Sequence, residues 1–186
     1  MNQDSRLSAL HAQFLATSSQ SMPLAGIIFW SVVAVSSRVF SAQQVAYLVG
    51  FGSGAIFPLA LLIDRLRGRK PVATPNKNPL LGMFLQSLVV VALLWPFVII
   101  AAVVSSSPDL VVLGGAILMG IVWIPYGWAA DDPVGMRHAI ARCVLSYTAF
   151  VLVPPAYRTS AVAIVVLMCY AYSLATMRRA YKESTS

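Results

Sequence analysis

The sequence predicts an all-α polytopic integral membrane protein, built as a bundle of six transmembrane helices. Of its 186 residues, 59% are hydrophobic and only 10% are charged, whereas about 25% of the residues of an average soluble domain are charged. The mean hydropathy is +0.78. The apolar residues form continuous runs rather than alternating with polar ones, which favours helices over strands. This composition excludes most classes of soluble enzyme.

Six apolar runs are separated by short polar connections. A helix needs about 20 residues to cross the hydrocarbon core of a bilayer, and the runs are close to this length. The third run is long enough to tilt, and the fifth is the shortest. The predicted spans, in chain order, are 22–39, 45–63, 79–104, 110–130, 139–153 and 160–177.

The chain divides into three parts around this bundle. Residues 1–21 are predicted to form a cytoplasmic N-terminal segment, residues 22–177 the transmembrane domain, and residues 178–186 a cytoplasmic tail. In the first segment Leu7, Leu10, Phe14 and Leu15 could share one helical face. Two interpretations follow, namely a helix lying at the membrane interface or a disordered tail.

Basic residues are divided unequally between the two ends of the predicted bundle. With both termini on one side, that side holds eleven Lys and Arg residues, and the other side holds only Arg38 and Arg158. Because cytoplasmic loops carry the excess of Lys and Arg, both termini are predicted to be cytoplasmic, in a bacterial plasma (inner) membrane. The net charge of +7 is thereby explained by topology and contact with lipid headgroups, and no nucleic-acid partner is expected.

Small residues gather on two of the predicted spans. Gly50 and Gly54 lie four residues apart on the second span, and Gly115 and Gly120 lie on the fourth. Small residues allow the backbones of two helices to approach closely. The pattern predicts helix packing, either within the chain or in a homo-oligomer.

The most polar part of the predicted bundle lies at the end of the fourth span. Two carboxylates there, Asp131 and Asp132, are within expected reach of Arg142, which is placed about one turn into the fifth span. An unpaired arginine in a membrane is costly, so a partner is expected. Ser146, Tyr170 and Ser173 fall at similar depths.

These residues predict a polar and aromatic pocket open to the cytoplasm. The alternative is an interfacial aromatic belt with ordinary ion pairs. The candidate ligand-binding residues are Trp123, Tyr126, Trp128, Asp131, Arg142 and Tyr147.

No catalytic or metal-binding pattern accompanies this pocket. His11 and His138 are the only histidines, and neither has other ligands at suitable spacing. His138 is expected at the headgroup level beside Arg137. No nucleophile, base and acid occur together in a recognisable arrangement. The sequence therefore predicts no metal and no cofactor, and an enzyme is the least favoured class.

Three short motifs carry a family resemblance: Phe57-Pro58-Leu59-Ala60, Asn78-Pro79-Leu80-Leu81-Gly82 and Ile124-Pro125-Tyr126-Gly127-Trp128. Through them the chain resembles a family of small bacterial membrane proteins, the domain of unknown function seven-thousand-and-ten, over about residues 22–177. The resemblance implies six helices and a bacterial origin. It implies no activity and no functional residue.

Two functions follow from these observations. The first is a small permease-like or ligand-binding protein of the lipid bilayer, whose pocket takes a small molecule. The second is a non-catalytic membrane scaffold or subunit that packs through its glycine-rich helix faces.

Overall fold

The computed structural model describes residues 3–17, 20–68 and 78–178, and within these ranges every regular element is helical. The fold class is therefore all-α, as predicted. The elements, in chain order, are α1 Gln3–Thr17, α2 Ser21–Ser36, α3 Ala42–Gly52, η1 Ser53–Ala55, α4 Ile56–Leu66, α5 Pro79–Val104, α6 Asp109–Ile121, α7 Trp123–Ala129, α8 Val134–Leu152, η2 Pro155–Tyr157 and α9 Arg158–Thr176.

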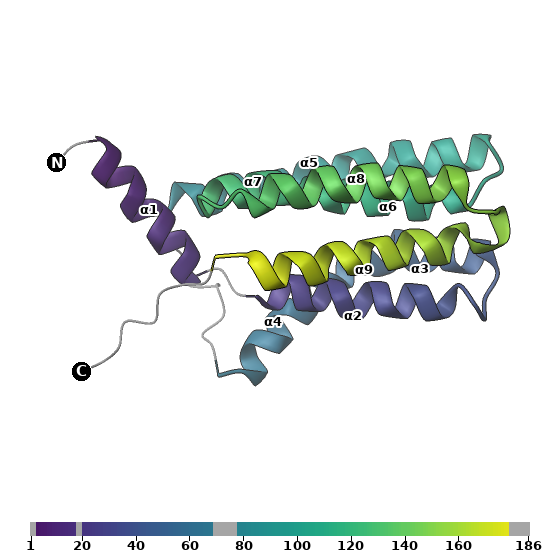
Figure 1. Cartoon of the computed structure of the whole chain (residues 1–186), viewed down its shortest axis with the longest axis horizontal. Coiled ribbons are helices and arrows are strands. Elements are labelled where there is room, and N and C mark those ends of the chain that lie inside the picture. The colour runs from purple at the N-terminus through teal and green to yellow at the C-terminus, as the bar shows by residue number, and fades with distance from the viewer. Residues whose placement is uncertain (1–2, 18–19, 69–77, 179–186) are drawn as a thin grey trace.

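Apart from α4, which runs obliquely to the others, the helices from α2 to α9 run roughly along one long axis and form a bundle (Figure 1). The turns after α2, α5 and α8 lie at one end of this bundle. Helix α1 and the last described residue, Arg178, lie at the opposite end, which we call the terminal end. Helix α9 packs against both α8 and α2, and α6 packs against α3, α5, α8 and α9. This packing places α8 and α2 on either side of α9.

Two of the long helical segments in the bundle, which we call rods, are interrupted. A 3₁₀ turn separates α3 from α4, and Val122 separates α6 from α7. Pro58 and Pro125 each stand at the third position of the helix that follows the interruption. Proline lacks an N–H group and its ring clashes with the preceding turn of a helix. An interruption directly before each proline relieves both conflicts.

The predicted apolar runs overlap helical parts of the described chain, and one helix begins earlier than predicted, which affects the site. The third prediction coincides with α5, which Asn78 caps by accepting a hydrogen bond from the N–H of Leu80 at 2.9 Å. Helix α8, however, begins at Val134 and not at residue 139. The carboxylate of Asp132, the residue before the N-cap Pro133, accepts a hydrogen bond from the N–H of Val134 at 3.0 Å, and this bond satisfies the first N–H group of the helix.

The N-terminal segment forms a helix from Gln3 to Thr17, so the disordered-tail interpretation is wrong for these residues. Phe14 is buried, and its ring lies 6.0 Å from that of Phe84 on α5. Nδ1 of His11 lies 2.9 Å from the carbonyl oxygen of Ala129, and the side chain of Asn78 donates to the carbonyl of Leu10. These contacts hold α1 across the terminal end of the bundle.

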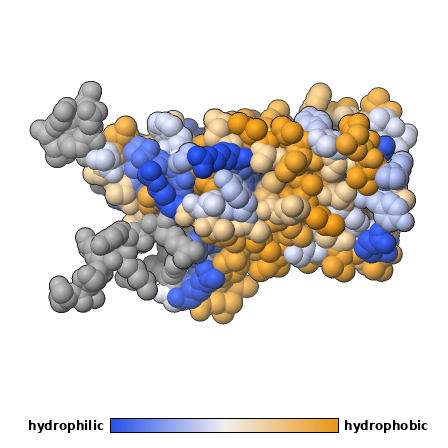
Figure 2. Space-filling model, in the orientation of Figure 1, coloured by the Kyte–Doolittle hydropathy of each residue, from blue (hydrophilic) through white to orange (hydrophobic). Residues whose placement is uncertain are grey.

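The exterior of the bundle is apolar along most of its length. Figure 2 shows hydrophobic side chains over the middle of the molecule and hydrophilic ones gathered near its two ends. Within the described residues, four helices are long and apolar enough to cross a membrane: Ala42–Leu66, Pro79–Val104, Asp109–Ala129 and Pro155–Thr176. Helices α2 and α8 are not among these four.

Candidate functional site

A stripe of three polar side chains runs along the inward face of α8. His138, Arg142 and Ser146 follow one another at intervals of four residues, which places them on the same face of a helix. All three have no exposed surface. Arg142 is the ninth of 19 residues in α8, so at a rise of about 1.5 Å per residue it lies roughly 12 Å from the start of the helix. The charge is thus near the middle of the bundle, two turns into α8 rather than one.

Two aromatic rings contact the guanidinium group of Arg142. Its Cζ atom lies 5.4 Å from the ring centroid of Trp30 on α2 and 5.1 Å from that of Tyr170 on α9. Both rings are themselves buried. A cation over an aromatic face is stabilised by the ring quadrupole, by about 2 kcal/mol when water is excluded. This stabilisation does not satisfy the N–H donors in the plane of the guanidinium.

No described residue accepts a hydrogen bond from Arg142. Its Nε, Nη1 and Nη2 atoms are all buried and all lack a partner among the described residues. The predicted pairing with Asp131 or Asp132 is therefore wrong. Asp131 is exposed and pairs with Arg178 at 3.1 Å, while Asp132 accepts from the N–H groups of Val134 and Arg178.

The remaining aspartates with described side chains are engaged elsewhere. Asp64 is buried near the terminal end and accepts a hydrogen bond from Ser21 at 2.7 Å. Asp109 accepts one from Thr159 at 2.9 Å. Consequently no described carboxylate neutralises Arg142.

His138 belongs to this centre and not to the headgroup level, so the prediction for this residue is wrong. Its ring stacks on Trp123, with the centroids 4.0 Å apart and the planes at 14°. Its Nδ1 atom lies 2.7 Å from Oγ of Ser173 on α9. Its Nε2 atom is buried without a partner among the described residues, as are Nε1 of Trp30 and Oγ of Ser146.

Two glycines make room for the side chains of this centre. A Cβ atom on Gly26 would lie less than 3.0 Å from ring atoms of Tyr170, and one on Gly120 would lie 3.0 Å from Cδ of Arg142. Both positions therefore need glycine for steric reasons. We refer to Trp30, His138, Arg142, Ser146 and Tyr170 as the arginine centre.

The structure brings only some of the six predicted pocket residues together. Arg142 lies in the arginine centre and Trp123 stacks on its histidine. Tyr126 borders them, 5.4 Å from the ring of Trp123. Trp128 and Tyr147 are more than half exposed on the outside of the bundle. Asp131 also lies at the surface. The predicted pocket residues therefore fall into an interior group, Trp123, Tyr126 and Arg142, and a peripheral group, Trp128, Asp131 and Tyr147.

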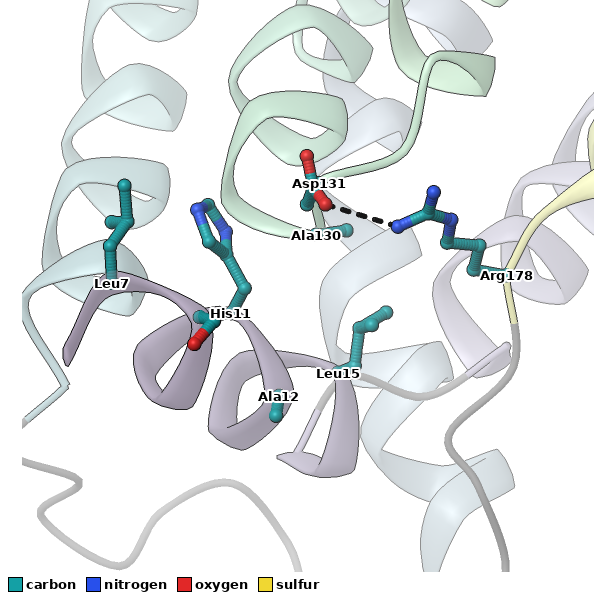
Figure 3. A pocket seen from close by; sticks show the side chains of 8 residues that line it. Leu7, His11, Ala12, Leu15, Ala130, Asp131 and Arg178 are labelled. Atoms are coloured by element: carbon teal, nitrogen blue, oxygen red, sulfur yellow. Dashed lines mark hydrogen bonds and ion pairs between the residues drawn. The ribbon is translucent and has the colours of Figure 1, made fainter. Parts of the chain in front are cut away.

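Asp131 lines a separate pocket at the terminal end. This pocket has a volume of about 420 Å³ and is lined by Leu7, Ser8, His11, Ala12, Leu15, Ala130, Asp131 and Arg178. Figure 3 shows the side chains of α1 on one side of it and the ion pair of Asp131 with Arg178 on the other. It does not include any residue of the arginine centre.

The predicted packing glycines have different surroundings. A Cβ on Gly50 would lie 3.8 Å from Ile99 and Val111, an ordinary contact, and one on Gly115 would lie 2.8 Å from Val49. A Cβ on Gly54 would meet nothing within 4 Å. Gly50, Gly115 and Gly120 thus face neighbouring helices of the same chain, and Gly54 faces outwards.

Two members of the arginine centre were missed in the sequence. His138 could have been found, because it precedes Arg142 by one helical turn and Ser146 follows by another. Trp30 lies in the middle of an apolar run and gives no such signal. Among the described residues, no three His, Cys, Asp or Glu side chains lie close enough together to hold a metal ion.

The fold and the site define an all-α protein with apolar outer faces and a buried cationic and aromatic centre. A model of a family of unknown function, DUF7010, matches residues 10–179. The chain therefore belongs to the DUF7010 family. No curated protein matches the chain, and no solved structure matches it.

Proposed function

We propose that this chain is an integral membrane protein whose six rods cross the bilayer and enclose a ligand site at the arginine centre. The four long apolar helices support this assignment. Helices α2 and α8 would complete the six: α2 is an apolar helix of 16 residues, and the outward residues Ile140, Val144 and Val151 of α8 are apolar and more than half exposed. In water such a surface would be a large apolar patch that favours aggregation. In a bilayer the same surface would contact lipid chains, which are equally apolar.

The proposed orientation puts both termini in the cytoplasm of a bacterial plasma membrane. Arg65 lies in the last turn of α4, Arg67 follows that helix directly, and Arg178 follows α9, on the same side as α1. Arg38 and Arg158 stand at the opposite end, where they lie over the rings of Tyr157 and Phe150. The excess of cations at the terminal end supports a cytoplasmic location for it.

The function that the geometry supports best is a permease-like or ligand-binding role at the arginine centre. The observation that carries this proposal is that Arg142 is fully buried with no hydrogen-bond partner among the described residues. A buried charge without a partner costs several kcal/mol. Ionisable residues within membrane helices face cavities or pathways and are typically functional.

A membrane scaffold remains the second candidate, and one observation favours it. Gly54 has open space around its Cα, and the neighbouring Phe51 is 84% exposed. A second helix could approach this face closely. The other three predicted packing glycines face helices of the same chain, which leaves this role with less support than the ligand site.

Two positions on α8, two residues apart, provide the test of the ligand site. Ser146→Cys places a thiol in the arginine centre, and Val144→Cys places one on the outward face two residues away. Both are made in a background with Cys143→Ala and Cys169→Ala, and membranes are treated with a small, charged methanethiosulfonate reagent. Because the centre is enclosed, a solute can enter it only when the helices open transiently. We therefore expect Ser146→Cys to react slowly and Val144→Cys to remain unmodified, because thiols ionise in water and not in lipid.

The opposite pattern contradicts the proposal. Val144 is 56% exposed and Ser146 fully buried, so a water-soluble bundle would label the first and protect the second. Protection of both thiols would support a membrane protein without a solute-accessible site, which is the scaffold. For orientation, Lys77→Cys should be labelled only from the cytoplasm and Ala156→Cys only from outside.

A further inference from the structure

We propose that the ligand of the arginine centre is a small oxyanion, a carboxylate or a phosphate, held by Arg142. This inference rests on the proposed function, since it names the chemical class that the ligand site takes. It follows from the charge of the centre, from the kind of hydrogen-bonding groups left without partners, and from their enclosure by the helices.

The charge of the centre requires an anion. Arginine is not deprotonated in proteins, so Arg142 brings a full positive charge to the middle of the bundle. The described aspartates are engaged at the two ends of the bundle by Ser21, Thr159, Val134 and Arg178. A cationic ligand would add to the uncompensated charge, and a neutral one would leave it unchanged.

The unpartnered groups of the centre are mainly donors. The guanidinium and the indole N–H of Trp30 can only donate hydrogen bonds, and the hydroxyl of Ser146 can do so as well. An oxyanion accepts several hydrogen bonds at once, and its two oxygens match the planar N–H groups of arginine.

The enclosure of the centre limits the size of the ligand. Trp30, His138, Arg142 and Ser146 have no exposed surface, and Tyr170 is 5% exposed. Gly120 and Gly26 are already in close contact with Arg142 and Tyr170. A lipid phosphate has acyl chains that must remain in the bilayer, so an enclosed site favours a free anion over a lipid headgroup.

Equilibrium binding to the purified full-length protein tests this inference. The protein is prepared in a neutral detergent in Hepes–Tris buffer and titrated with sodium acetate, sodium phosphate and sodium chloride. Intrinsic tryptophan fluorescence and the melting temperature are recorded together, because Trp30 and Trp123 border the centre. We expect acetate or phosphate to change the fluorescence saturably and to raise the melting temperature with the same midpoint.

The variants separate the role of Arg142 from nonspecific salt effects. Arg142→Met should abolish both responses, and Arg142→Lys should weaken the response at least tenfold, because lysine cannot bind two oxygens in the geometry of arginine. Arg158→Met is the matched control. Arg158 also lies over an aromatic ring, at 5.0 Å from the centroid of Phe150, but stands at the other end of the bundle, and its variant should bind as the unmodified protein does.

The titration is repeated in vesicles of phosphatidylcholine with and without phosphatidylglycerol. Three outcomes would overturn the inference: no saturable response to acetate or phosphate in the folded protein, an equal response in Arg142→Met, or a response confined to vesicles containing phosphatidylglycerol. If Arg142→Met does not fold, Arg142→Lys and Ser146→Ala are used in its place. An unchanged affinity for acetate and phosphate in both variants would contradict the inference. Labelling of Ser146→Cys without an anion response would reject the oxyanion and retain the proposed function. Protection of Ser146→Cys would reject the proposed function itself.

Discussion

The backbone of Gly120 on α6 packs against the aliphatic part of Arg142 on α8, so closely that a Cβ atom on residue 120 would lie 3.0 Å from Cδ of the arginine. This contact fixes where the arginine stem runs between α6 and α8. The position of the guanidinium beside Trp30 and Tyr170 therefore depends on a residue that contributes no side chain of its own.

Replacing Gly120 with leucine should displace Arg142. Overpacking of an interior contact typically costs about 1–3 kcal/mol, and we expect a lower melting temperature in detergent together with loss of the anion response. Gly54→Leu is the matched control, because a Cβ atom there would meet nothing within 4 Å. Equal melting temperatures for the two variants would contradict the packing described for Gly120.

Gly135→Ala should destabilise the protein more than any other glycine-to-alanine change. A Cβ on Gly135 would lie less than 3.0 Å from backbone atoms of Trp123 and Gly127, and backbone cannot rotate away as a side chain can. We expect a loss of about 3 kcal/mol from this overpacking, measured by thermal or denaturant unfolding in detergent.

The control for this change is Gly82→Ala on α5, where a Cβ would meet nothing within 4 Å. Alanine favours a helix over glycine by up to about 1 kcal/mol, so this variant should be as stable as the unmodified protein or slightly more so. A Gly135→Ala protein with the same stability as Gly82→Ala would show that α7 and α8 are further apart than described.

The helices could be predicted from sequence because each apolar run ends at strong local signals. Asn78 and Pro79 mark the start of α5, and the prediction of its bounds is confirmed. The start of α8 carries a comparable signal in Asp132 followed by Pro133, which is typical of a helix N-terminus. The apolar run itself begins only at residue 139, because Arg137 and His138 interrupt it, and a prediction based on apolar residues therefore places Arg142 one turn too close to the helix start.

The site was harder to predict, because its partners come from three helices. A charged residue within an apolar run identifies Arg142 by itself, but its neighbours Trp30 and Tyr170 are determined by the packing of α8 and α2 against α9. Proximity along the chain instead suggested Asp131, which faces solvent. The sequence indicates that a buried arginine needs a partner. It does not indicate that the aromatic rings of Trp30 and Tyr170 surround the guanidinium.

Asp131 should tolerate asparagine and not valine. Its φ angle is 49°, a left-handed conformation that Asn and Asp adopt readily and β-branched residues do not. Asp131→Asn removes the exposed ion pair with Arg178, which is worth less than about 1 kcal/mol. Asp131→Val adds backbone strain of roughly 1–2 kcal/mol. Equal unfolding free energies for the two variants would show that the turn is not left-handed.

The interaction of Trp30 with Arg142 can be measured by a double-mutant cycle. Trp30→Leu removes the aromatic face that lies 5.4 Å from Cζ of Arg142, and Trp30→Phe retains such a face. In the unmodified background we expect the leucine variant to be less stable than the phenylalanine variant, with a cation–π contribution of about 2 kcal/mol at a desolvated site.

With Arg142→Met in place there is no cation for either ring, so the difference between leucine and phenylalanine at position 30 should shrink by that amount. The cycle cancels the change in volume at residue 30, because the same two substitutions are compared in both backgrounds. Trp128 supplies the control, since it is 53% exposed on the outside of the bundle, and its exchange for leucine should not couple to Arg142. A coupling of zero at Trp30 would mean that the tryptophan stabilises the centre by packing alone, and that the charge of Arg142 depends on its ligand for compensation.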